Sequence, residues 1–136
     1  MFILHHFAIS VKNLSVSEKF YEMFGFKKAH EWIAQDKSLQ IVHLKNKENI
    51  ILELFCYASP QNPPLHTLEL STDLPVIGVK HFAFNADSIL EAKKKLQLTG
   101  IKILKDITDG KTGIKYLFIK DPDEILIEIV EDHRKL

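Results

Sequence analysis

The chain contains one cysteine, Cys56, among its 136 residues, so it can form no internal disulfide. A lone cysteine suits a reducing compartment, and we expect a cytoplasmic protein. Long apolar runs are also missing, because the opening segment MFILHHFAI is too short to span a bilayer and two histidines interrupt it. That segment lacks the basic region and the small-residue cleavage site of a signal peptide, so neither secretion nor membrane association is expected.

An excess of one charge sign is missing as well. Eighteen Lys and Arg residues balance 18 Asp and Glu residues, for a formal net charge of +0. A neutral chain has no general attraction for nucleic acid or anionic lipid, so neither is an expected partner. A phosphate loop is not present either: Gly110-Lys111-Thr112 matches the end of that motif, but Lys105 stands where its first glycine is required.

An internal repeat is the strongest signal in the chain. His6 and Glu53 recur as His81 and Glu128, each 75 residues later (81 − 6 and 128 − 53). The same offset, with no gap, aligns further identical residues: Phe7 with Phe82, Ala8 with Ala83, Gly25 with Gly100, Lys45 with Lys120, and Ile50 with Ile125. Two half-length copies predict two modules of the same structure. A His and a Glu at equivalent places in both copies is the pattern that a two-fold metal site requires.

Each half is predicted to fold as β-α-β-β-β. The first half shows strand patterns over 4–11, near 32–33, over 39–44 and over 49–57, and a helix that begins at the capping box Ser15-Val16-Ser17-Glu18 and ends at Gly25. The second half shows strand patterns over 79–85, 101–104, 114–119 and 124–130, and a helix that runs from Ser88 to Gly100.

The two halves are joined by residues 58–75, which contain four of the five prolines. This segment is predicted to be a linker or a lid without regular structure. The expected organisation is a first module over 1–57, the linker over 58–75 and a second module over 76–136, together forming one domain.

Strand alternation predicts which residues share a face. Phe7 and Ile9 belong to the bulky row that packs on the helix, so His6 faces the other way, as does His81 in the second copy. Glu53 and Glu128 are carboxylates inside otherwise apolar strands. A buried, unpaired carboxylate is costly, so each needs a partner, and a metal ion is a suitable one.

Two imidazoles and two carboxylates form a ligand set suited to one divalent ion of Zn, Ni, Co, Fe or Mn. The other histidines are not expected to be ligands. His5 has the wrong strand parity, and His43 aligns with Phe118 and is predicted to be a plain strand residue. The remaining histidines have no repeat partner and are predicted to lie on the surface: His30, His66 and His133.

Several segments resemble the signatures of the vicinal oxygen chelate superfamily, which includes glyoxalase I, ring-cleaving dioxygenases and the bleomycin resistance proteins. The matching segments are His6-Phe7-Ala8-Ile9, Phe20-Tyr21, Gly25-Phe26, Glu53-Leu54-Phe55, Val79-Lys80-His81-Phe82-Ala83-Phe84, Asp121-Pro122-Asp123 and Ile127-Glu128. The resemblance covers nearly the whole chain. It implies an α+β fold in which two tandem βαβββ modules form a curled mixed sheet around a central metal or ligand pocket.

The ligand pattern His6, Glu53, His81 and Glu128 is most similar to that of glyoxalase I. The resemblance therefore implies a metal-dependent lyase or isomerase that acts on a small carbonyl compound or its thiol adduct, and it also implies a homodimer. Glu128 is the expected mobile general base, with Glu53 as its pseudo-symmetric counterpart.

Two other functions remain open. An iron-dependent ring-cleaving dioxygenase would use His6, His81 and Glu128 and would leave Glu53 unexplained. A metal-free binding protein of the bleomycin-resistance type would leave all four residues unexplained.

The chain also departs from bacterial glyoxalase I, since Ser10 and Tyr57 stand where that family has Arg and Asn for binding glutathione. The resemblance therefore carries over the metal set but not the glutathione site.

Overall fold

The computed structural model describes residues 1–136, which form two compact units, 1–62 and 63–136. The first unit contains β1 (His6–Ser10), α1 (Leu14–Glu22), β2 (Lys27–Ile33), β3 (Leu39–Lys45) and β4 (Ile51–Tyr57). The second contains the 3-10 helix η1 (Leu65–Leu68), α2 (Leu70–Asp73), β5 (Phe82–Asn85), α3 (Ile89–Leu98), β6 (Ile103–Asp109), β7 (Lys115–Lys120) and β8 (Leu126–Glu131). The predicted α+β class and the two βαβββ modules are confirmed. The grouping of both modules into one domain stays a prediction.

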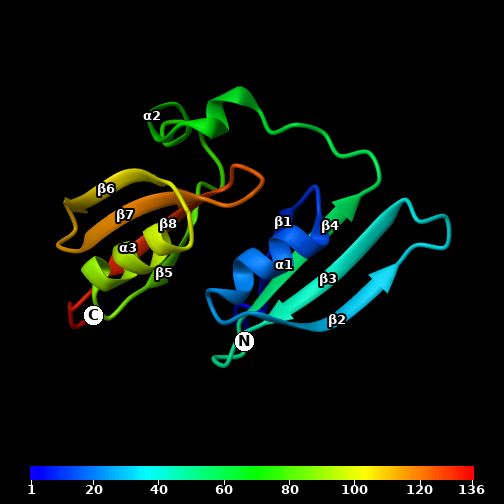
Figure 1. Ribbon diagram of the computed structural model, residues 1–136, viewed down its shortest axis with the longest axis horizontal. Helices are drawn as coiled ribbons and strands as arrows, with labels where there is room; N and C mark the ends of the chain where they lie inside the picture. Colours follow the sequence, from blue (N-terminus) through cyan, green and yellow to red (C-terminus); the bar gives the residue numbers. More distant parts are fainter. The chain divides into compact units, whose positions relative to one another are not determined.

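Each module is built on an open, four-stranded mixed sheet. The strand orders are β1-β4-β3-β2 and β5-β8-β7-β6, so the two sheets have the same topology. The first strand of each module pairs in parallel with the last, and the other neighbours are antiparallel. In both modules the single long helix lies on one face of its own sheet (Figure 1). Neither sheet closes into a barrel.

The apolar core of each module lies between its sheet and its helix. In the first module Leu52 and Leu54 of β4 are fully buried, as is Tyr21 of α1. In the second module Ile127 of β8 is fully buried and Ile89 of α3 nearly so. Because side chains alternate along a strand, the residues between these core positions face away from the helix. The predicted parity of His6, Glu53 and Glu128 is thereby confirmed.

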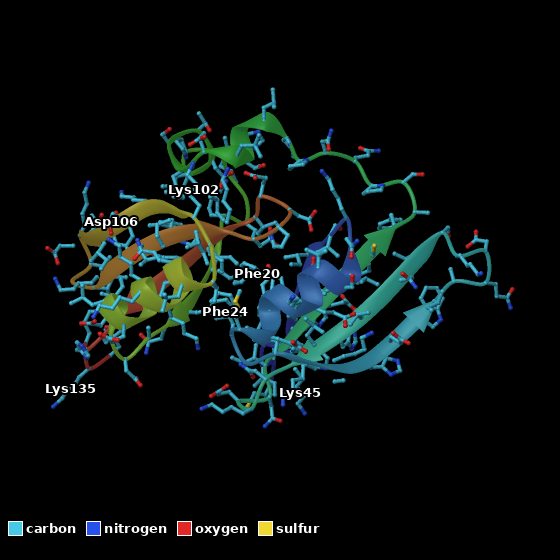
Figure 2. The ribbon with its side chains drawn as sticks, viewed as in Figure 1. Phe20, Phe24, Lys45, Lys102, Asp106 and Lys135 are labelled. Carbon is cyan, nitrogen blue, oxygen red and sulfur yellow. The ribbon has the colours of Figure 1, made fainter.

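Each helix is followed within three residues by the glycine that the sequence indicates as its stop. Gly25 and Gly100 have φ angles of +83° and +79°, a left-handed conformation in which glycine carries no steric penalty. The helices are short, since α1 has 9 residues and α3 has 10. No helix is both long enough and apolar enough to cross a membrane. Phe20 of α1 and Phe24, in the turn after the helix, have ring centroids 5.4 Å apart (Figure 2).

The predicted start of α1 is wrong. The helix begins at Leu14, and its N-cap is Asn13, whose side-chain oxygen accepts a hydrogen bond from the Val16 N–H at 3.2 Å. Ser15 lies inside the first turn, and its hydroxyl donates to the same Asn13 oxygen. Asparagine caps helices as well as serine does, so the earlier residue prevails. In α3 the N-cap is Ser88, as predicted, and Ser88 aligns with Asn13 under the 75-residue offset.

Replacing Asn13 with alanine is expected to lower the free energy of unfolding by about 1 kcal/mol, because the Val16 N–H loses its cap. Ser15→Ala leaves that hydrogen bond in place and should cost less than half as much. Urea unfolding of the two variants measures the difference. Equal losses, or a larger loss for Ser15→Ala, would contradict the assignment of the cap.

The prediction that residues 58–75 hold no regular element is also wrong. Two short helices, η1 and α2, occupy the middle of this segment. The prolines do not oppose them, because Pro64 is the N-cap of η1 and Pro75 follows the end of α2. The Lys80 ammonium then holds the end of α2 through the Asp73 carbonyl and carboxylate, at 2.8 and 3.2 Å. A lid function for this segment stays a prediction.

Candidate metal site

In the first module, the Glu53 carboxylate lies between two imidazole rings. Glu53 is in β4, the strand between β1 and β3, and its side chain is 16% exposed. His6 in β1 places its Nε2 3.4 Å from Glu53 Oε2. His43 in β3 is the direct cross-strand partner of Glu53, and its Nε2 is 2.8 Å from Glu53 Oε1. Each carboxylate oxygen therefore has its own histidine.

In the second module, the Glu128 carboxylate has one histidine partner. His81, immediately before β5, places its Nε2 3.2 Å from Glu128 Oε2. On the other side, the cross-strand partner of Glu128 is Phe118 of β7. The Phe118 ring offers no hydrogen bond to a carboxylate and packs edge-on against His81, with ring centroids 4.9 Å apart. Glu128 is as well shielded as Glu53, with 16% of its side chain exposed.

The partner that each buried carboxylate needs is present within its own module, and it is a histidine. The unpaired atom in the second module is instead on His81, whose Nδ1 is buried and has no hydrogen-bond partner. A partly buried imidazole with one ring nitrogen on a carboxylate and the other without a partner is compatible with a metal ligand. No group of three or more His, Cys, Asp or Glu side chains is arranged as a complete metal site.

Further histidines extend the cluster in the first module. His5 and His6 bring their Nδ1 atoms within 2.9 Å, so the second ring nitrogen of His6 also has a partner. A hydrogen bond on one imidazole nitrogen fixes which tautomer the other presents. The His30 ring lies 6.0 Å from that of His43. His30, His66 and His133 are on the surface, as predicted.

The sequence matches a family model described as the Glyoxalase/Bleomycin resistance protein/Dioxygenase superfamily over residues 3–129. The chain belongs to this superfamily. The uncharacterized protein YwkD of Bacillus subtilis is 28% identical over 94% of this chain and 95% of its own length. Lactoylglutathione lyase of Schizosaccharomyces pombe is 30% identical over 93% of this chain, which spans about half (46%) of that enzyme. A glyoxalase family protein from Enterococcus faecalis has a similar structure, with a TM-score of 0.79 and 26% identity over 95% of this chain and 97% of that one.

Membership in the superfamily confirms the resemblance found in the sequence. It supports a glyoxalase-like or related role for the chain. The superfamily's description also covers resistance proteins and dioxygenases, so membership alone does not choose among these activities. The residues around the candidate site must make that choice.

His43 is the contact that sequence reasoning missed. The repeat predicts a plain strand residue at this position, because the equivalent residue, Phe118, cannot be a ligand. The available signal was the β3–β4 hairpin, which brings Glu53 opposite some residue of β3. The strands predicted over 39–44 and 49–57 leave a turn over 45–48, which would pair Leu44 with Asn49 and place His43 opposite Ile50. The actual register pairs Lys45 with Ile51, with five residues between them, and brings His43 to Glu53.

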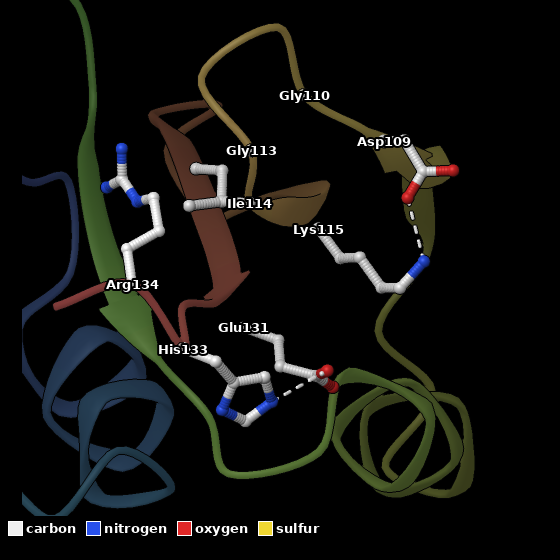
Figure 3. A pocket seen from close by; sticks show the side chains of 8 residues that line it. All are labelled: Asp109, Gly110, Gly113, Ile114, Lys115, Glu131, His133 and Arg134. Carbon is white, nitrogen blue, oxygen red and sulfur yellow. Dashed lines mark hydrogen bonds and ion pairs between the residues drawn. The ribbon is translucent and has the colours of Figure 1, made fainter.

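A hollow of about 390 Å³ in the second module is lined by none of the four predicted ligands. Its charged side chains are in ion pairs, as Figure 3 shows for Lys115 with Asp109 and for His133 with Glu131. The backbone N–H of Ile89, at the start of α3, donates to Glu131 and is the main cause that lowers the pKa of this carboxyl. We therefore interpret the hollow as a structural feature near the C-terminus.

The C-terminal residues are held to the second module by Arg134. Its guanidinium pairs with Asp132 at 2.7 Å and donates to the Thr112 carbonyl at 3.0 Å. Hydrogen bonds from Arg134 lower the pKa of Asp132 to about 2. Both groups are satisfied by these contacts, which leaves no unpaired charge here for a ligand.

Proposed function

We propose that the protein is a metal-dependent, glyoxalase-like enzyme, a lyase or isomerase that acts on a small carbonyl compound or its thiol adduct. The observation that supports this is the His–Glu pair in each module. In both pairs the carboxylate is largely buried, lies within 3.4 Å of an imidazole and faces away from the core. A buried His–Glu pair does not by itself help a module to fold, so its presence in both modules favours a functional role.

The proposed ligands of one divalent ion are His6, Glu53, His81 and Glu128. Imidazole nitrogen and carboxylate oxygen are donors that fit Zn, Ni, Co, Fe and Mn. A bound ion of this kind supplies polarisation of a carbonyl oxygen. Carboxylates of the protein would transfer the substrate's proton. Glu128, which has one polar partner, is the proposed general base. Glu53, which has two histidine partners, is its more tightly held counterpart.

Metal analysis of the wild-type protein, purified without a chelator or a histidine tag, tests the proposal. We expect about one divalent transition-metal ion per set of four ligands. Oxygen-uptake measurements with catechol as the probe are expected to show no consumption. Iron with rapid oxygen uptake would favour the dioxygenase, and protein without metal would favour a binding protein, so either result would overturn the proposal.

We also propose that the protein is a homodimer. The helix of each module covers only one face of its sheet, and a half-buried polar face normally needs a second layer. The wild-type protein is therefore expected to elute with about twice the chain mass of 15.7 kDa. Light scattering at micromolar concentration measures this mass. A particle of one chain mass would contradict the dimer.

A further inference from the structure

The two modules differ at one equivalent position beside their carboxylates. Position 43 in β3 and position 118 in β7 are related by the 75-residue offset, and each lies directly across from the glutamate of the neighbouring strand. His43 hydrogen-bonds to Glu53, whereas Phe118 cannot hydrogen-bond to Glu128. The pseudo-symmetry of the pairs is broken here, because a second histidine contacts the carboxylate in the first module but not in the second.

The added group restrains the Glu53 side chain from the side opposite to His6. A carboxylate only accepts hydrogen bonds, so the ring N–H of His43 donates to Oε1. His6 approaches Oε2 from the other neighbouring strand. With one oxygen attached to each strand, the carboxylate cannot rotate without breaking a contact. Glu128 is attached on one side only.

His43 lies between two other imidazole rings. Its ring centroid is 6.5 Å from that of His6, at an interplanar angle of 22°, and 6.0 Å from that of His30. Its side chain is 31% exposed, so the β-strand surroundings limit its rotamers while part of the ring stays in water. A partly buried group with few accessible rotamers is suited to position a neighbour.

We propose that His43 is a positioning residue, which holds Glu53 in one orientation as a fixed ligand, while Glu128 stays free to move. The proposal rests on the metal set proposed above. Partners that hydrogen-bond to a ligand orient it, and their loss typically lowers metal affinity about 10- to 100-fold. His43 would thus act through Glu53 without contacting the ion, and the two glutamates would have different roles.

Three variants test this role. His43→Phe copies the second module and removes the hydrogen bond. His43→Gln keeps an N–H donor at a similar reach. His30→Phe is the matched control, because this neighbouring histidine contacts the His43 ring but not Glu53. Metal affinity, measured by competition with a chromophoric chelator, is expected to fall about 10- to 100-fold in His43→Phe only.

A second measurement does not depend on metal. In the metal-free protein, NMR couplings of the Glu53 side chain report whether it occupies one rotamer. We expect one rotamer in the wild type and in His43→Gln, and averaged couplings in His43→Phe. Unchanged couplings in His43→Phe, or equal metal affinity in all four proteins, would overturn the positioning role. If the wild type binds no metal, the proposed function fails, and the couplings still decide whether His43 holds Glu53.

Discussion

Replacing His81 or Glu128 with alanine is expected to remove most of the bound metal. His81 carries the orphaned buried nitrogen, and Glu128 is its ion-pair partner. A divalent ion that loses one of four protein ligands is left with too few donors to compete with water and buffer. We expect metal affinity to fall on the order of 100-fold or more. This loss should be at least as large as the loss from removing a residue that only hydrogen-bonds to a ligand. Elemental analysis after dialysis measures the retained metal.

The matched controls are His66→Ala and His133→Ala. Both histidines are exposed and lie in the same unit as His81. They report any general loss of metal that comes from removing a surface imidazole. Thermal unfolding of the metal-free variants separates loss of the site from loss of the fold. Full retention of metal by both His81→Ala and Glu128→Ala would refute the ligand assignment.

Isomerisation of the methylglyoxal–glutathione adduct is expected to be slow, with kcat/KM below roughly 10⁶ M⁻¹s⁻¹, inside the usual range of enzymes but well below its upper end. Binding energy from remote parts of a substrate lowers the barrier at its reacting centre. Glutathione offers carboxylates for this purpose, and a cationic or amide side chain would be needed to bind them. The chain has Ser10 and Tyr57 at the positions that bacterial glyoxalase I uses for this contact.

The structure makes these two positions testable together. Because β1 and β4 run parallel, Ser10 and Tyr57 lie at the same end of the first sheet, and both are exposed. Ser10→Arg combined with Tyr57→Asn is expected to raise kcat/KM at least about tenfold, the effect of one modest ionic contact. Ser71→Arg adds the same charge elsewhere on the surface and is the control. A wild-type value above about 10⁶ M⁻¹s⁻¹ would refute the inference.

Much of the fold was predictable because the two halves of the sequence align with each other without a gap. The 75-residue offset relates α1 to α3 and each strand of the first module to one of the second. Alternation along β4 and β8 was enough to predict that Glu53 and Glu128 face away from the core. The errors came where two local signals compete. Asn13 and Ser15 are both good caps, and the prolines of 58–75 flank helical turns as readily as they break them.

The candidate site shows where sequence reasoning reaches its limit. The sequence alone determined the two modules, the faces of their sheets and the recurrence of His6–Glu53 as His81–Glu128. Only the tertiary structure revealed that His43 hydrogen-bonds to Glu53 and that Glu128, with Phe118 across from it, has a single partner. The reason is that cross-strand pairing depends on turn length. One more residue in the loop after Lys45 changes which residue of β4 lies opposite each residue of β3. The apolar pattern within a single strand does not reveal this change of register.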